Sequence, residues 1–196
     1  MNEALVISNV VLWLLLLVVI IGILGLARQV GVLFERVAPM GALMIDQGPK
    51  VNELAPAFEL EALRGGTVRI GGRSTRSQLV FWLSPTCPVC KKLLPVLKSI
   101  KEAESRWLQV VLASDGEHPQ HTDFSKRFAL DDFEYVLSHG LGMTYRISKL
   151  PYAVLIDEGG KVRAKGLVNS REQLESLFAA SEAGVASIQE FLDQRA

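Results

Sequence analysis

Residues 79–90 read LVFWLSPTCPVC and join a compact apolar run to the two cysteines of the chain. The run from Gln78 to Leu83 contains β-branched and aromatic residues and is followed by Pro85, which is typical of a buried β-strand. Beyond Pro88, apolar residues recur at the spacing of one helix face. These positions are Leu93, Leu94, Leu97 and Ile100. The cysteines therefore lie where a predicted strand passes into a predicted helix.

Cys87 and Cys90 form a C-x-x-C pair at the predicted start of this helix. The first N–H groups of a helix have no intrahelical acceptor, and together with the helix dipole they stabilise a thiolate over a thiol. Cys87 therefore has the environment that a nucleophile needs. Cys90, one turn further along, is close enough to form a disulfide with Cys87 after Cys87 has attacked a partner. The pair predicts thiol–disulfide exchange.

Other uses of an isolated C-x-x-C pair fit this sequence less well. A zinc site needs further ligands, but there is no second cysteine pair and no paired spacing among His118, His121 and His139. We therefore expect no metal centre and assign these histidines no role. Haem attachment needs a histidine where Lys91 stands, and a structural disulfide closing so short a loop constrains the unfolded chain little. Two thiolates also suit Cu(I), so a copper-carrying binding module remains an alternative.

The later part of the chain alternates further predicted strands and helices. The strands are Val110–Ala113, Ala153–Asp157 and Lys161–Lys165, the last two joined by a turn at Glu158-Gly159-Gly160. Ser170 and Gln173 form a capping box that begins a final helix. The order strand, helix, strand, hairpin and helix predicts a mixed α/β fold built in layers.

Pro151 directly precedes one of these strands, in the sequence Leu150-Pro151-Tyr152. Proline cannot donate to a sheet ladder, so it belongs at the first position of the strand. A cis peptide bond there would place a backbone edge beside the dithiol, although a loop proline is more often only a turn former. Pro151 is therefore a candidate cis-proline, and its isomer is a question for the structure.

The stretch Ala4–Ala27 has no charged residue, and 20 of its 24 positions are apolar. At about 1.5 Å per residue it would span roughly 36 Å, enough to cross a hydrocarbon core of about 30 Å. A cleaved signal peptide is the alternative, but no Lys or Arg precedes the stretch, and it exceeds the roughly 7–15 apolar residues of a signal peptide. We predict a transmembrane helix at 4–27 in contact with the lipid bilayer, a juxtamembrane linker at 28–50 and one soluble domain at 51–196.

Charge limits the possible partners and bears on topology. The chain has 21 basic and 21 acidic residues, so nucleic acid is not an expected partner, because phosphate binding needs a concentrated basic surface. Arg28 and Arg36 follow the apolar stretch, whereas nothing basic except the amino terminus precedes it. By the positive-inside tendency these arginines weakly favour a cytoplasmic soluble domain.

Three segments together resemble the thioredoxin superfamily, in particular its membrane-anchored TlpA-like and peroxiredoxin-like branch. Residues 79–95 are similar to the active-site strand and helix of that branch, residues 53–60 to its entry segment and residues 149–157 to its cis-proline strand. The segments also occur in the order and spacing of the family. The resemblance implies a thioredoxin-like fold, a central mixed sheet flanked by helices, preceded here by one transmembrane helix.

Over nearly its full length the chain is similar to a family of accessory proteins of methylamine utilization. The resemblance implies a single-pass protein of the bacterial inner membrane with a periplasmic domain, opposite to the orientation that Arg28 and Arg36 favour. It implies that this domain forms or corrects disulfides in the small (β) subunit of methylamine dehydrogenase, with an unidentified membrane or periplasmic redox partner. Cys87 would be the nucleophile and Cys90 the resolving cysteine, with no cofactor besides this dithiol.

Apolar residues beside the dithiol are candidates for substrate binding, and we expect an apolar rim there that docks an extended substrate. The candidates are Pro85, Pro88, Val89, Leu150, Pro151 and Tyr152, and simple packing of the site is an equally good interpretation of them. The predicted strand Gln78–Leu83 lacks the buried acid of thioredoxin itself, so deprotonation of Cys90 would need another base or water.

Several functions of this superfamily stay open at the level of the sequence. Oxidase and isomerase action differ in the reduction potential and in the redox partner, which the Pro88-Val89 pair does not reveal. A reductant for cytochrome c maturation and a thiol peroxidase are the enzymatic alternatives. Peroxidase action would not require Cys90.

Overall fold

The computed structural model describes residues 2–36 and 48–183, in two units that divide between residues 45 and 46. The first unit holds a single helix, α1 (Asn2–Arg36). Its segment Glu3–Leu26 has a mean hydropathy of 3.0 and no buried residue, so by length and composition it can cross a membrane. The helix continues into the predicted linker, and residues 37–47 lie outside the described residues.

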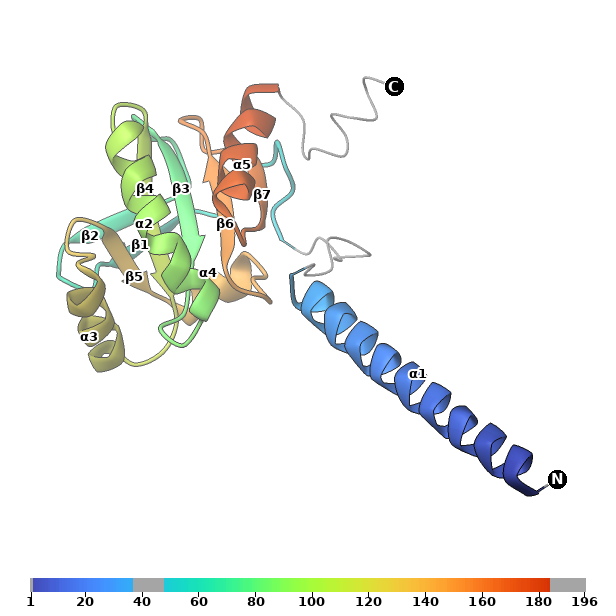
Figure 1. Ribbon diagram of the computed structural model, residues 1–196. Coiled ribbons are helices and arrows are strands. Elements are labelled where there is room, and N and C mark those ends of the chain that lie inside the picture. Colours follow the sequence, from blue (N-terminus) through green and yellow to red (C-terminus); the bar gives the residue numbers. More distant parts are fainter. Residues whose placement is uncertain (1, 37–47, 184–196) are drawn as a thin grey trace. The chain divides into compact units, whose positions relative to one another are not determined.

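The second unit is built on a five-stranded sheet with the strand order β5-β4-β3-β6-β7 (Figure 1). The strands are β3 (Ser77–Trp82), β4 (Leu108–Ser114), β5 (Glu134–Leu137), β6 (Tyr152–Ile156) and β7 (Val162–Leu167). β3, β4 and β5 run parallel to one another, whereas β6 is antiparallel to β3 and β7 is antiparallel to β6. The mixed sheet expected from the sequence is confirmed.

Both faces of this sheet are covered. The covering elements are the hairpin β1 (Phe58–Glu61) and β2 (Thr67–Ile70) with the helices α2 (Pro88–Ala103), α3 (His118–Phe128), α4 (His139–Thr144) and α5 (Arg171–Ala183). Leu79 and Phe81 of β3 share one core with residues of α2 and α5, whereas Val80 and Trp82 share a second core with residues of β2 and α4. Successive side chains of a strand point to opposite faces. The central strand is therefore apolar at almost every position.

The elements predicted from the sequence agree with the structure to within about two residues at most boundaries. The predicted hairpin turn joins β6 to β7, and Gly160 in it has a φ of +80° and lies so close to Gly72 that a Cβ would be 2.6 Å from the Gly72 carbonyl oxygen. The predicted capping box is altered. The Gln173 N–H donates to Ser170 Oγ, but the Gln173 side-chain oxygen accepts from the Asn169 N–H.

Five elements have no counterpart in the sequence prediction: the hairpin strands β1 and β2, and α3, β5 and α4. Each gives a weak local signal. β5 has four residues, α4 has six residues of which two are glycine, and α3 buries only His121, Phe124 and Ser125. Such short or polar segments are stabilised by their tertiary contacts rather than by their own periodicity.

Candidate active site

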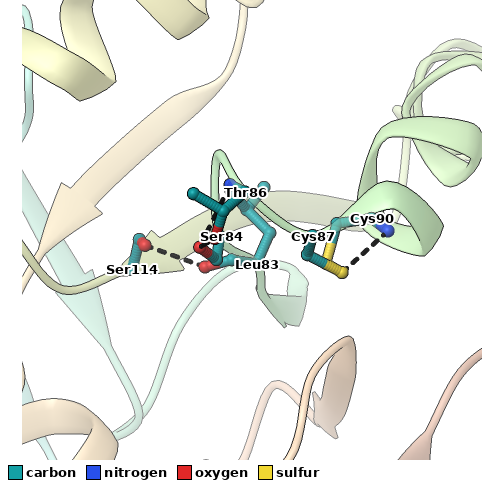
Figure 2. The surroundings of a disulfide bond; sticks show 6 residues. All are labelled: Leu83, Ser84, Thr86, Cys87, Cys90 and Ser114. Atoms are coloured by element: carbon teal, nitrogen blue, oxygen red, sulfur yellow. Dashed lines mark hydrogen bonds between the residues drawn. A yellow bond between two sulfur atoms is a disulfide. The ribbon is translucent and has the colours of Figure 1, made fainter.

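Cys87 and Cys90 are joined by a disulfide at the start of α2 (Figure 2). Their Cα atoms are 5.3 Å apart. Cys87 is the N-cap of the helix, in an extended conformation, and Pro88 follows it in the first turn. Proline suits this place because its missing N–H would have no intrahelical acceptor. Both cysteines therefore lie where the sequence predicts them, between β3 and the helix that follows.

The two sulfurs differ in their surroundings. The Cys87 Sγ accepts a hydrogen bond from the backbone N–H of Cys90, with an N···S distance of 3.1 Å. Cys87 is partly exposed, whereas Cys90 is fully buried. In the reduced protein, the N–H donor and the positive end of the helix dipole favour negative charge on the Cys87 sulfur. The geometry supports Cys87 as the attacking sulfur and Cys90 as the resolving one.

The loop between β3 and Cys87 is held by hydrogen bonds that sequence reasoning did not identify. Ser84 Oγ lies 2.9 Å from Thr86 Oγ1 and accepts from the Thr86 N–H, and the Cys87 N–H donates to the Ser84 carbonyl. The Ser114 hydroxyl at the end of β4 donates to the Leu83 carbonyl at 2.8 Å (Figure 2). A serine two residues before a threonine is a signal for such a turn. These bonds fix the approach of the chain to the disulfide.

The surroundings of Cys90 lack a carboxylate of the kind expected near a thioredoxin dithiol. Cys90 belongs to the same apolar core as Phe81 on β3. Across residues 48–181, whose side chains the structure describes, no Asp or Glu side chain is buried. Desolvation without a partner disfavours a charged group, so this core gives Cys90 no stabilised charged form when the disulfide opens.

The Leu150–Pro151 peptide bond is cis, and Pro151 is buried directly before β6. The next residue, Tyr152, is the partner of Trp82 in the β3–β6 ladder. Trp82 is the last residue of β3, and the loop to Cys87 begins just after it. The cis-proline and the disulfide loop therefore lie at the same end of the sheet.

The predicted apolar rim contains residues of two kinds. Val89 and Tyr152 are half-buried and pack against the cores on opposite faces of the sheet, so they contribute to packing. Pro85 is also half-buried, whereas Pro88 and Leu150 are exposed, Leu150 to 40%. The exposed members leave apolar surface beside the disulfide, and substrate docking there stays a prediction.

A buried histidine connects α3 to the strand ends near the site. His121 is almost fully buried, with Nδ1 2.6 Å from the Tyr135 hydroxyl and Nε2 2.9 Å from the Asp115 carbonyl oxygen. A carbonyl only accepts, so Nε2 carries the proton and Nδ1 accepts from Tyr135. The sequence assigned His121 no role, and its position in α3 gave no sign of this burial. His118 and His139 are exposed.

Burial lowers the pKa of His121, an effect that the carbonyl and the charge of nearby Asp115 oppose and the charge of His118 reinforces. We therefore expect the free energy of unfolding to fall as the pH drops through about 6.5, the ordinary histidine pKa. Below that pH the unfolded chain binds a proton at His121 that the folded protein resists, so the stability present at higher pH is lost. Urea denaturation of the full chain in mild detergent at several pH values measures the effect.

The matched variants for this measurement are His121→Gln and His118→Gln. The first should remove the part of the pH dependence below 6.5 that comes from the buried ring. The second should retain most of it, because burial is the largest cause of the lowered pKa of His121 and the charge of His118 is the smallest. Identical pH dependence in the wild type and in His121→Gln would show that His121 does not couple folding to protonation.

The chain matches known proteins in sequence and in structure. Residues 66–181 match the thioredoxin-like domain family. The chain is 49% identical over 195 residues to the methylamine utilization protein MauD of Methylorubrum extorquens, covering 98% of this chain and 94% of that protein. It is 47% identical over 191 residues to MauD of Paracoccus versutus, covering 97% and 96%.

A solved structure shares the fold at low sequence identity. The thioredoxin domain of a thiol-disulfide oxidoreductase from Bacteroides vulgatus superimposes with a TM-score of 0.56 at 21% identity, covering 64% of this chain and 95% of that domain. The family match, the full-length similarity and the shared fold agree with one another. The chain therefore belongs to the MauD family of methylamine utilization proteins, and its second unit is a thioredoxin-like domain.

Proposed function

We propose that the protein is a membrane-anchored thiol–disulfide oxidoreductase whose periplasmic domain forms or corrects disulfides in the small subunit of methylamine dehydrogenase. The observation that carries the proposal is the asymmetric Cys87–Cys90 pair at the start of α2, with one sulfur accessible and one buried. Membership of the MauD family supports a role in methylamine utilization. The apolar segment Glu3–Leu26 supports the membrane anchor.

As an oxidase, the disulfide form would accept two electrons from its substrate. A substrate thiolate attacks Cys87, the accessible sulfur, and the Cys87–Cys90 bond breaks to release Cys90, which takes up a proton. A second substrate thiolate then attacks the substrate sulfur of the mixed disulfide and releases Cys87 as a thiolate. The substrate gains a disulfide and the protein becomes a dithiol, which a redox partner must reoxidise.

As an isomerase, the reduced form would act without net electron transfer. The Cys87 thiolate attacks an incorrect substrate disulfide, and the leaving substrate thiolate is set free to attack another substrate disulfide. A substrate thiolate then displaces Cys87, which regenerates the dithiol. If Cys90 displaces the substrate instead, the substrate leaves as a dithiol and the protein is left with the Cys87–Cys90 disulfide, which a redox partner must reduce. The same two sulfurs serve both directions, and the redox partner decides between them.

Trapping in cells that make methylamine dehydrogenase tests the proposal. A Cys90→Ser protein is expected to accumulate a mixed disulfide between Cys87 and the small subunit, because the intramolecular resolving sulfur is absent. Nonreducing gels and mass spectrometry of the adduct identify the partner. The double variant Cys87→Ser, Cys90→Ser is the control and should form no adduct. Adducts that never include the small subunit would reject this substrate, and the absence of any adduct would reject thiol exchange.

A fusion protein made in the same cells tests on which side of the membrane the soluble domain lies. An alkaline phosphatase fused after Ala196 should be active if the domain lies in the periplasm. An inactive fusion, with the protein still membrane-bound, would place the domain in the cytoplasm, as Arg28 and Arg36 favour.

A further inference from the structure

A cavity of about 170 Å³ opens at the end of the sheet where β3, β4 and β5 end. Its apolar wall consists of Trp82, Leu83, Met143, Ile147 and Leu150, and Gly142 of α4 completes this wall. Its polar side includes Asp115 and His139, with the His139 Nδ1 3.6 Å from the Asp115 Oδ2. The cavity thus has an apolar interior with hydrogen-bonding groups at one side.

Two of the lining residues directly adjoin the disulfide site. Leu83 is followed by the loop Ser84–Cys87, and its carbonyl is held by Ser114, which also lines the cavity. Leu150 precedes the cis-proline Pro151. A polypeptide bound through a cysteine at Cys87 would therefore have its neighbouring residues beside this opening.

The cavity also gathers exposed apolar surface. In the described part of the second unit, residues 48–183, four large hydrophobic side chains are exposed: Leu54, Trp107, Met143 and Leu150. Two of these line the cavity, Met143 with 65% of its surface exposed and Leu150 with 40%. Scattered single residues of this kind are ordinary, but here two of the four lie around one concave site, where a bound apolar side chain would cover both.

Gly142 of the helix α4 leaves part of the cavity wall without a side chain. It has six residues, and two of them are Gly140 and Gly142, although each glycine costs about 1 kcal/mol relative to alanine inside a helix. A Cβ at Gly142 would meet no atom within 4 Å. No close backbone contact therefore requires glycine there, and a larger residue would project into open space beside the cavity.

We propose that this cavity is a specificity subsite that takes the ring of an aromatic side chain near the reacting cysteine of an extended polypeptide. The inference rests on the proposed function. The volume is close to that of an apolar cavity of about 150 Å³ that holds benzene. The Met143 thioether is suited to contact with an aromatic ring, and the apolar wall gains by excluding water. A polypeptide cysteine, as a thiol or in a disulfide, would thus react faster with the protein when an aromatic residue lies next to it.

Peptides that carry one cysteine as a mixed disulfide with glutathione test the subsite. In the series, Phe, Ala or Asp is placed in turn at each of the two positions on either side of the cysteine. For each peptide, the rate constant for attack by the reduced protein is divided by the rate constant for attack of the same protein on oxidised glutathione. At one position, Phe is expected to raise this ratio roughly tenfold over Ala, and more over Asp.

The substitution Gly142→Leu adds a bulky side chain at the opening of the cavity and is expected to remove the preference for Phe. Gly140→Leu is the matched control, because Gly140 lies on the same helix but does not line the cavity. It should keep the preference. Thermal unfolding checks that both variants fold, and Met143→Ser, with Leu54→Ser as its exposed control, gives a second test if Gly142→Leu does not fold.

The outcomes separate this inference from the proposed function. If the wild type attacks neither the peptides nor oxidised glutathione, the proposed function fails. If it attacks them all but shows no preference for Phe at any position, the subsite is rejected. A preference that persists in folded Gly142→Leu or, where that variant does not fold, in Met143→Ser also rejects it.

Discussion

Replacing Cys87 with serine is expected to eliminate thiol–disulfide exchange, whereas replacing Cys90 should leave one stoichiometric attack. The Cys87 sulfur is partly exposed and accepts a hydrogen bond from the Cys90 N–H, so it can attack a disulfide as a thiolate. Cys90 is fully buried and cannot reach an external disulfide in the folded protein. The hydroxyl of serine at position 87 is too weak a nucleophile to replace the thiolate.

A chromogenic aromatic disulfide measures this difference on the reduced proteins. The wild type should release about two coloured thiolates per chain, Cys90→Ser about one and Cys87→Ser almost none over the same interval. In denaturant both single variants should release about one, which is the control for thiol content. Fast release from folded Cys87→Ser would show that Cys90 is accessible and would contradict the assigned roles.

Truncating Phe81 to alanine is expected to lower the free energy of unfolding by about 3–5 kcal/mol. Phe81 is fully buried in β3, the central strand of the sheet, in the same core as Cys90 and the inner face of α2. The loss combines the transfer free energy of the ring with the cost of the cavity that it leaves. A domain of this kind is stable by only about 5–15 kcal/mol, so this is a large fraction of the total.

Urea denaturation of the full chain in mild detergent, followed by tryptophan fluorescence, checks this expectation. Leu54→Ala is the control, because Leu54 is 69% exposed and its truncation should change the free energy of unfolding by no more than about 0.5 kcal/mol. Equal losses for the two variants would mean that the β3–α2 core does not dominate stability.

The parts of the fold that were predictable carry strong local signals. β3 and α2 follow from an apolar run, a proline at the helix start and a repeating apolar face, and β6–β7 follow from two extended runs around Gly159-Gly160. β5 and α4 were missed because a strand of four residues and a helix of six with two glycines have no periodicity of their own. β5 is stabilised by pairing with β4, which is distant in the sequence.

The candidate site also has features that local sequence predicts and features that depend on tertiary contacts. Cys87 and Cys90 were predictable because a helix N-terminus acts on a cysteine only a few bonds away. The bonds of Ser114 to Leu83 and of His121 to Tyr135 join residues 31 and 14 positions apart. The first depends on the pairing of β3 with β4 and the second on the packing of α3 against β5.

The sequence by itself determined the apolar helix at the N-terminus, the strand and helix around the dithiol, and the place of that dithiol at a helix start. Each depends on residues that are close together in the sequence, where side-chain spacing and helix capping act directly. Only the tertiary structure decided that Leu150–Pro151 is cis, that His121 is buried and that a cavity adjoins the disulfide loop. These features depend on which distant segments pack together, and the short-range periodicity of a sequence does not predict that packing.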